Sequence, residues 1–507
     1  MTKNFFPTKE YLNYLFALLA GTLLPLAFAP IGISILAIIS PALLLILWLQ
    51  ANPRQSFWRG FFYGIGFFGI GVSWVYISIH RYGNTNAILS FIFTLLFVAV
   101  LALFIATQGY LFTRLFPQNN RSKILIAFPA MWVLLEWIRS WILTGFPWLL
   151  LGYSQTNSPF KSLAPLVGVY GLSFIVTLSS GLLLLIFRDG KRHWYKSLLP
   201  FILLWLFAFC LMPIKWTQSV GNRIFVSLVQ GNIPQSIKWD PQQAATSLNI
   251  YQQLTTEHWN SDIIVWPESA ITFLLPDAMN YLKPLSNTAK LHNTAILSGI
   301  PIPLFDDKTN SVNYYSSMIA FGDGSGHYFK RHLVPFGEYV PFQNLLRGLF
   351  GFLNLPMSDF SDGPSHQQLL NAKGISLAPF ICYEIAFPNL VISTAKHANL
   401  LVTISDDTWF GDSFAPGQHL QMGQFWAIAT GRDVLFATNS GITAIIDSRG
   451  KILDTIPKFQ QTVLTGTAQP RIGNTPLLII GNFWPLLMIF LLLVFNWSAR
   501  KINTYQK

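Results

Sequence analysis

The sequence predicts a polytopic α-helical membrane protein that carries one globular domain of the α/β or layered α+β class. Two observations predict this. Of the 507 residues, 52% are hydrophobic and 11% are charged, which is less than half of the roughly 25% charged residues of an ordinary soluble domain. Long apolar runs also alternate with basic flanks. This composition excludes a purely soluble enzyme and a disordered chain.

The net charge of +12 comes from the hydrophobic parts of the chain. From Lys215 to Arg471 there are 16 Lys and Arg against 18 Asp and Glu, and the remainder holds 17 basic and 3 acidic residues. Basic residues beside apolar runs are typical of membrane topology rather than of a nucleic-acid-binding surface. We therefore expect the bilayer, and no nucleic acid, as a partner.

Runs of about 20 apolar residues predict helices that cross a bilayer. Eight such runs occur, at 11–30, 32–49, 60–79, 88–112, 124–143, 164–187, 197–213 and 475–496. The first has no small-residue cleavage site, so we expect a retained span and not a signal peptide. The predicted domains are a membrane domain of seven helices at 1–213, a globular domain at 214–474, and the eighth helix with a short tail at 475–507.

The basic flanks predict the orientation of these helices. Fourteen basic residues lie at alternate ends of the runs: Lys3, Lys9, Arg54, Arg59, Arg114, Arg121, Lys123, Arg188, Lys191, Arg192, Lys196, Arg500, Lys501 and Lys507. The opposite short loops hold only Arg81 and Lys161. The positive-inside rule then places both termini in the cytoplasm and residues 214–474 outside it.

Two charges lie inside the fifth run. Glu136 and Arg139 stand three residues apart, on the same side of a helix,. An unpaired charge at mid-membrane costs at least about 2.5 kcal/mol, so we expect them to pair. Both a structural pair and a contact with a lipid headgroup fit this pattern.

Short β-branched or apolar segments predict the strands of the globular domain. They are RIFVSLVQ, DIIVWP, TAILSGI, YYSSMIAFG, LAPFICYE, NLLVTIS, VLFATN and ITAIID. Residues 241–258 and 416–431 between them favour helices. Strands that alternate with helices indicate an α/β or layered α+β domain.

Cys382 is the first candidate for chemistry. Cys210 lies inside the seventh apolar run, so Cys382 is an unpaired thiol in an oxidising compartment,. Such a thiol is either a small buried hydrophobe or a reactive group. In APFICYEIAFP it follows directly on an apolar strand, where a turn exposes a nucleophile beside backbone N–H groups,.

Two further residues, Glu268 and Lys330, could act together with Cys382. Glu268 follows a strand in DIIVWPESA, and Lys330 lies in HYFKRHLVPFGEYVPF. Alone, each is typical of a loop or surface charge. Together with Cys382, the carboxylate takes the thiol proton, the ammonium favours thiolate and oxyanion, and the thiolate attacks a carbonyl.

These residues resemble a known family. VWPES, KRHLVPFGE and ICYE resemble the Glu-Lys-Cys triad motifs of the carbon–nitrogen hydrolase (nitrilase) superfamily. Over essentially the whole chain, five segments are similar to the apolipoprotein N-acyltransferase family: TGFPWLLLGYSQ (144–155), VQGNIPQSIKW (229–239), FKRHLVPFGEYVPF (329–342), ICYEIAFP (381–388) and SDDTWFGDSFAPGQHLQM (405–422).

The resemblance implies an α-β-β-α nitrilase-like domain on the periplasmic face of the inner membrane, working without metal, nucleotide or other cofactor. It implies transfer of an acyl chain from a phospholipid, chiefly phosphatidylethanolamine, to the α-amino group of the S-diacylglyceryl cysteine of a diacylated apolipoprotein. Glu268 is then the general base, Lys330 the transition-state stabiliser and Cys382 the nucleophile, which carries the acyl group as a thioester. The supporting residues implied are Trp239, Glu338, Tyr383 and Glu384.

Three further interpretations remain open. Residues 344–356 are apolar with one Arg, which favours a lid or membrane-dipping arm over ordinary core,. A membrane-tethered amidase or nitrilase that hydrolyses C–N bonds needs the same triad. A transporter with an accessory outer domain predicts several ionisable residues in the spans, and mainly Glu136 and Arg139 occur there,.

The first prediction concerns topology. Single cysteines introduced near residue 300 should react with a membrane-impermeant thiol reagent in intact cells, because the positive-inside rule places this domain outside the cytoplasm. Cysteines near residue 190 should react only after the cells are permeabilised. Protection of residue 300 in intact cells contradicts the predicted orientation.

Overall fold

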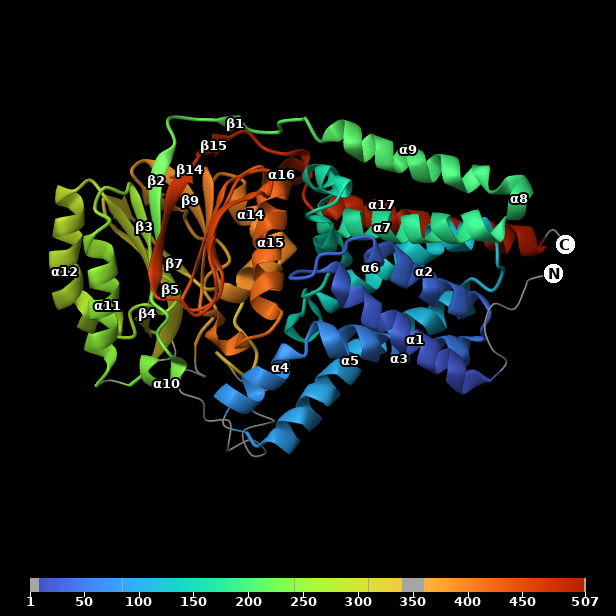
Figure 1. Ribbon diagram of the computed structural model, residues 1–507, viewed down its shortest axis with the longest axis horizontal. Coiled ribbons are helices and arrows are strands. Elements are labelled where there is room, and N and C mark those ends of the chain that lie inside the picture. Colours follow the sequence, from blue (N-terminus) through green and yellow to red (C-terminus); the bar gives the residue numbers. More distant parts are fainter. Residues whose placement is uncertain (1–8, 84, 241, 309, 340–359, 506–507) are drawn as a thin grey trace. The chain divides into compact units, whose positions relative to one another are not determined.

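The fold is described from a computed structural model, in which residues 9–83, 85–240, 242–308, 310–339 and 360–505 are described. The predicted arm at 344–356 lies outside these residues. The chain divides into two compact units, one of Met1–His80, Thr85–Ile214 and Ile480–Lys507, and one of Arg81–Asn84 and Lys215–Ile479. Figure 1 shows the helices of the first unit and the sheets of the second.

The first unit is helical. Its α-helices are α1 (Glu10–Leu23), α2 (Leu36–Leu49), α3 (Pro53–Gly71), α4 (Trp74–Ile77), α5 (Ala87–Leu115), α6 (Phe128–Arg139), α7 (Ala164–Arg188), α8 (Gly190–His193), α9 (Tyr195–Leu211) and α17 (Phe483–Tyr505). Within the described residues, three helical stretches are long and apolar enough to cross a membrane, namely Glu10–Ala27, Ala87–Leu115 and Pro159–Arg188. The bent pair Pro53–Gly71 and Trp74–Tyr82 adds a fourth if it is one span.

Three other predicted spans correspond to shorter apolar helices, over Leu36–Leu49, Tyr195–Leu211 and Phe483–Ser498. The predicted span at 124–143 contains the π-helical turn Lys123–Ala127 followed by α6, and it is not among the described helices that are long and apolar enough to cross a membrane. The predicted helix at 475–496 is interrupted, because α16 (Pro476–Ile480) ends before α17 begins. Gly481 lies between them with φ +70°, a left-handed conformation that glycine adopts without a Cβ clash and that ends a helix. The expectation of one continuous eighth helix over 475–496 is therefore corrected.

Glu136 and Arg139 hold an irregular segment of this unit. Leu151 N–H donates to Glu136 Oε1 at 2.8 Å, and Arg139 donates to the carbonyls of Phe146 and Trp148 at 2.6 and 2.7 Å. Non-helical backbone in apolar surroundings is tolerated only when its polar groups are satisfied. The two charges therefore have a structural role, which is to satisfy the backbone of the TGFPWLLLGYSQ motif.

The second unit contains two large mixed sheets. One has the strand order β14-β2-β3-β4-β5-β7 and the other β13-β12-β11-β10-β9-β8-β6. Their bounds are β2 (Ile224–Gln230), β3 (Ile263–Val265), β4 (Ala295–Asp306), β5 (Ser311–Gly322), β6 (Gly324–Ser325), β7 (His327–Phe329), β8 (Leu370–Ala372), β9 (Ile375–Ile381), β10 (Leu400–Ser405), β11 (Val434–Thr438), β12 (Thr443–Ile446), β13 (Ile452–Ile456) and β14 (Thr462–Ala468). β1 (Gln218–Ser219) and β15 (Arg471–Ile472) form a small separate pair.

Helices cover the outer faces of both sheets, as Figure 1 shows. These are α11 (Ala244–Thr256) and α12 (Leu275–Leu291) on the first sheet, and α14 (Pro388–Ala395) and α15 (Ala415–Thr430) on the second. The first helical layer packs through a buried cluster that includes Tyr251, Trp266 and Leu282. The unit is thus a four-layered α-β-β-α domain, which confirms the fold that the family resemblance implies.

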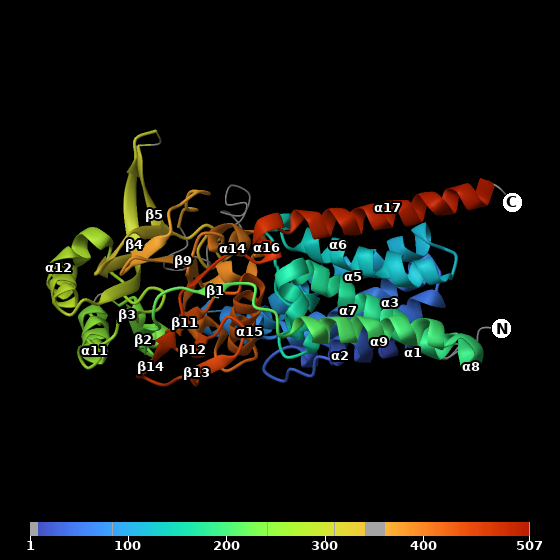
Figure 2. The ribbon, with the colours of Figure 1, turned by 90° about the horizontal axis from the view of Figure 1, so that it is seen from above.

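The eight predicted strand segments all form strands, and the helices predicted at 241–258 and 416–431 appear as α11 and α15. The sequence patterns did not single out α12 or β14. They also did not reveal the length of the β4–β5 hairpin, which Figure 2 shows projecting from the sheet.

The second prediction concerns Gly299 on β4. A Cβ there would lie 2.5 Å from Ser269 N, 2.7 Å from Glu268 Cα and 2.8 Å from Pro267 O. Because these are backbone atoms, Gly299→Ala should cost about 1–3 kcal/mol of stability, measured by thermal unfolding in detergent. The matched control is Gly466→Ala, whose Cβ would meet only the end of the flexible Ile445 side chain. Equal melting temperatures for the two variants would contradict this packing constraint.

Candidate active site

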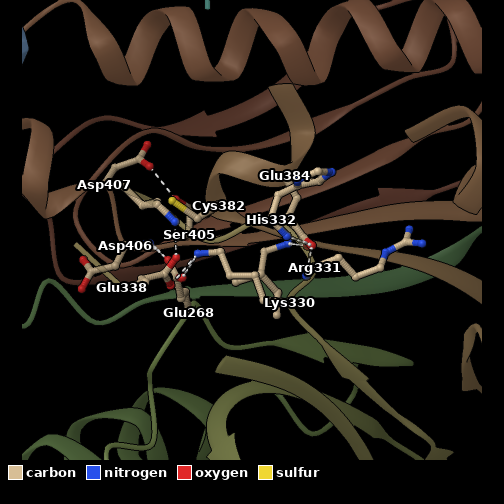
Figure 3. Close-up of polar contacts among 12 residues, drawn as sticks. Glu268, Lys330, Arg331, His332, Glu338, Cys382, Glu384, Ser405, Asp406 and Asp407 are labelled. Carbon is tan, nitrogen blue, oxygen red and sulfur yellow. Dashed lines mark hydrogen bonds and ion pairs between the residues drawn. The ribbon is translucent and has the colours of Figure 1, made fainter. Parts of the chain in front are cut away.

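The predicted triad residues all follow the carboxyl ends of strands. Glu268 comes after β3, and Lys330 follows β7, which runs in the same direction as β3 because both β4–β5 and β5–β7 are antiparallel. Cys382 follows β9, whose partner β10 is parallel. Since strands of one direction end at one edge, each sheet presents its chemistry-bearing residues at a single edge. Figure 3 shows these side chains together.

Lys330 lies between two carboxylates. Its ammonium is 2.9 Å from Glu268 Oε1 and 2.8 Å from Glu338 Oε1, and the lysine side chain is 1% exposed. The remaining Glu338 oxygen accepts from Val334 N–H at 2.8 Å. Glu338 therefore fixes Lys330 rather than standing alone, in keeping with the supporting role proposed for it.

Glu268 is held from both sides. Its Oε2 accepts from Asp406 N–H at 2.9 Å, and its backbone carbonyl accepts from Lys238 Nζ at 3.0 Å. Lys238 also pairs with the Asp406 carboxylate at 2.5 Å. The sequence analysis did not identify Lys238 or Asp406, although both lie in the motifs 229–239 and 405–422. Membership in these motifs marked both positions, but the local sequence does not show that the two side chains pair.

Cys382 occupies a strained turn. It begins the 3₁₀ turn Cys382–Ala386 with φ +53°, a left-handed conformation that costs a non-glycine residue about 1–3 kcal/mol. Ser269, next to Glu268, has φ +51°. Two of the left-handed non-glycine residues of the chain are therefore at or next to proposed reacting groups, where an enforced backbone geometry can aim a side chain,.

Glu384 braces this turn against the strand end that carries Lys330. Its Oε2 accepts from Ile381 N–H at 2.9 Å, and its Oε1 accepts from Arg331 N–H at 2.6 Å and Tyr328 O–H at 2.9 Å. The carboxylate is fully buried. Glu384 therefore joins the two sheets at the site and supports its geometry without facing the thiol.

The other two predicted supporting residues are Trp239, which ends a short helix, and Tyr383, which lies within the turn of Cys382. Trp239 is half-buried and directly follows α10 (Gln235–Lys238). Tyr383 packs edge-on against Phe387, with ring centroids 4.9 Å apart. Within the described residues, no group of three or more His, Cys, Asp or Glu side chains is placed to hold a metal ion.

The charges around the thiol act in opposite directions. Burial raises the pKa of Cys382 well above its usual value, and the nearby carboxylates of Glu268 and Asp407 raise it further. Lys330 and the neighbouring Ser405 hydroxyl group lower it. Burial also lowers the pKa of Lys330, but Glu268 and Glu338 together raise it well above the ordinary value, so the ammonium stays charged.

An α-β-β-α domain that brings a buried thiol, a carboxylate and a charged lysine to its strand ends has the arrangement expected of the carbon–nitrogen hydrolase class. The family description "Carbon-nitrogen hydrolase" matches residues 225–476, and "Apolipoprotein N-acyltransferase N-terminal domain" matches residues 20–182. The chain is 45% identical over 493 residues to an apolipoprotein N-acyltransferase of Coxiella burnetii, covering 96% of this chain and 100% of the relative.

Two more relatives carry the same name. The one from Azotobacter vinelandii is 43% identical and covers 96% of this chain and 94% of its own. The relative from Pseudomonas aeruginosa is 44% identical, and the match covers 94% of this chain and 93% of the relative. This chain belongs to the apolipoprotein N-acyltransferase family, which confirms the predicted resemblance and the predicted class, an acyltransferase within the carbon–nitrogen hydrolase superfamily.

The third prediction concerns the thiol. The thiolate is the form that reacts with alkylating reagents, so the pH profile of Cys382 alkylation reports its pKa. In a Cys210→Ser background, Lys330→Met should move the profile to higher pH and Glu268→Gln to lower pH, by about 1–3 units for loss of a neighbouring charge. Lys451→Met, on the exposed surface, is the control and should not move it. Shifts of the same sign in both site variants would contradict the arrangement described.

Proposed function

We propose that this enzyme moves a fatty acyl chain from a membrane phospholipid, chiefly phosphatidylethanolamine, through a thioester on Cys382 to the α-amino group of an S-diacylglyceryl cysteine at an apolipoprotein N-terminus. The observation that carries the mechanism is the buried thiol beside the Glu268–Lys330 pair. The names of the relatives support the acceptor. The catalytic roles of Glu268, Lys330 and Cys382 are part of this proposal.

The first half-reaction forms the thioester. Cys382 gives its Sγ proton to Glu268, and the thiolate attacks the carbonyl carbon of the donor ester. Lys330 stabilises the negative charge on sulfur and then on the oxyanion. When the tetrahedral adduct collapses, the C–O bond breaks and the glycerol oxygen takes the proton from Glu268. Lysophospholipid leaves, and the acyl group stays on sulfur.

The second half-reaction transfers the acyl group. The neutral amine of the acceptor attacks the thioester carbonyl and Glu268 accepts a proton from nitrogen. Collapse breaks the C–S bond, and the Cys382 thiolate recovers a proton from Glu268. In each half-reaction the Glu268 carboxylate therefore serves first as the base and then as the acid. Its ion pair with Lys330 supports this double role, because it keeps the carboxylate at the site in both steps.

Exclusion of water favours transfer over hydrolysis. Cys382, Glu268 and Lys330 are 8%, 7% and 1% exposed. A thioester at such a site is shielded from bulk water until an acceptor amine displaces it. The long apolar helices and the names of the relatives also favour the acyltransferase over an amidase that hydrolyses small C–N bonds.

We also propose the membrane arrangement that the sequence predicts. In this proposal eight spans lie in the inner membrane, residues 1–213 and 475–507 form the membrane part with both termini in the cytoplasm, and residues 214–474 face the periplasm. Rows of exposed apolar side chains on α5 and α9, such as Ile88, Phe91, Leu203 and Phe207, support contact with lipid.

The fourth prediction tests the mechanism. Purified enzyme mixed with phosphatidylethanolamine and no acceptor should release a burst of lysophospholipid near one equivalent per active site. Mass spectrometry should then find a fatty-acyl adduct on Cys382. Glu268→Gln and Lys330→Met should slow adduct formation on the order of 10²–10³-fold or more, the usual effect of losing a general base or an oxyanion partner.

Gly466→Ala, on β14, serves again as the folded control with a normal burst. Absence of any burst in the wild-type enzyme would show that both substrates bind before chemistry, and the ping-pong order would be abandoned. A normal adduct in either site variant would refute the role assigned to that residue.

A further inference from the structure

The backbone of the proposed nucleophile is held by a histidine from another element. His419 lies on α15, and its Nε2 is 3.0 Å from the carbonyl oxygen of Cys382. The side chain is fully buried. The rings of Phe410 and Phe436 meet it edge-on at centroid distances of 6.1 and 5.0 Å. A polar ring enclosed by aromatic groups has to be paired to be tolerated there.

The second nitrogen of this ring meets a carboxylate. His419 Nδ1 is 3.0 Å from Asp407 Oδ1, and the same oxygen accepts from Ser405 Oγ–H at 2.6 Å. Asp407 is also fully buried, and its Oδ2 has no hydrogen-bond partner among the residues that the structure describes. A Cβ at position 441 would lie 2.5 Å from this Oδ2, so Gly441 leaves the carboxylate its space.

These contacts determine where the protons lie. A carbonyl oxygen only accepts, so His419 Nε2 must carry a proton to bond Cys382 O. A second proton must lie between Nδ1 and Asp407 Oδ1, because two lone pairs would otherwise face each other. The pair is therefore either imidazolium with carboxylate or imidazole with carboxylic acid. In both forms it has no net charge, which suits a buried site.

The His419–Asp407 pair acts on both the backbone and the side chain of Cys382. His419 holds the Cys382 carbonyl, which belongs to the residue with φ +53°. Asp407 accepts the Ser405 O–H, and the Ser405 hydroxyl group lies close enough to the Cys382 thiol to affect its pKa. From these contacts we propose that His419 and Asp407 are positioning residues of Cys382, which aim its sulfur, and that His419 offsets part of the negative charge that Asp407 presents to the sulfur. This inference rests on Cys382 being the nucleophile.

Several charged groups face the thiol from other elements. Glu268 follows β3, Lys330 follows β7 and Asp407 follows β10, while Glu384 lies on the turn of Cys382 itself. Glu268 and Asp407 oppose the thiolate and Lys330 favours it. If His419 is lost, Asp407 has no charge partner and opposes the thiolate fully. If Asp407 is neutralised, one opposing charge disappears.

The test therefore uses two variants with opposite expected signs. In the full-length Cys210→Ser enzyme in detergent, the pH profile of Cys382 alkylation by iodoacetamide is measured. His419→Phe should move it to higher pH and Asp407→Asn to lower pH, each by about one unit, which is a tenfold change in thiolate at fixed pH. His419→Gln keeps an N–H donor and should retain more phosphatidylethanolamine-dependent acylation than His419→Phe, while its alkylation profile also moves upward.

Trp426→Phe is the matched control. Trp426 lies on the same helix, is fully buried, and donates Nε1–H to the carbonyl of Ile385 in the same turn at 2.8 Å. It should lower the melting temperature without moving the alkylation profile. If the His419 and Asp407 variants behave like Trp426→Phe, or shift the profile in the same direction, the proposal is wrong. Should His419→Phe not fold, His419→Gln and Asp407→Asn still decide it.

This outcome is separate from that of the proposed function. Alkylation requires neither phospholipid nor acceptor, so the positioning role can fail while the wild-type enzyme still forms an acyl adduct. Conversely, if a Cys382→Ala variant still transfers the acyl group to the acceptor at the wild-type rate, Cys382 is not the nucleophile, whatever the alkylation profiles show.

Discussion

The proposed site depends on the two ion pairs that the Lys330 ammonium makes. The ammonium is buried between the carboxylates of Glu268 and Glu338, and it is the positive charge that favours a thiolate on Cys382. Removing one partner of such a buried pair typically costs about 3–5 kcal/mol, because a charge is left without compensation. The geometry of the proposed base, stabiliser and nucleophile is therefore coupled to the stability of the domain.

The two sheets each bring part of this arrangement. The first sheet ends at Glu268 and Lys330, and the second ends at Cys382 and Asp406. Neither sheet holds a complete set. Two hydrogen bonds cross between the sheets, from Asp406 N–H to Glu268 and from Arg331 N–H to Glu384. They hold the strand ends of the two sheets together at the site. The α-β-β-α layering is thus a requirement of the chemistry as well as of the core.

Strain and burial at the site are compensated by neighbouring polar groups. The left-handed Cys382 is held through Glu384 on its own turn and through His419 on α15. Burial alone raises the pKa of the thiol and would keep it protonated. In the proposed mechanism, these compensating groups let the sulfur stay reactive at a site that is dry enough to protect a thioester.

The sequence alone determined the class of the protein, eight strands of the domain and the candidate residues. Charge asymmetry and apolar length are local properties, and so is the alternation of strands and helices, which is why eight strand segments and the motifs around Glu268, Lys330 and Cys382 could be recognised. The break at Gly481 was not foreseen, because composition does not report where a backbone turns left-handed,.

Only the tertiary structure decided which residues support the triad. Lys238 and Asp406 are 168 residues apart, and His419 reaches a carbonyl 37 residues away. Nothing in their local sequence predicts such pairings, since a buried lysine or histidine is read as a surface charge until its partner is known. Because distant strand ends meet at one edge of each sheet, the fold supplies the partners, and with them the protons and charges on which the chemistry rests.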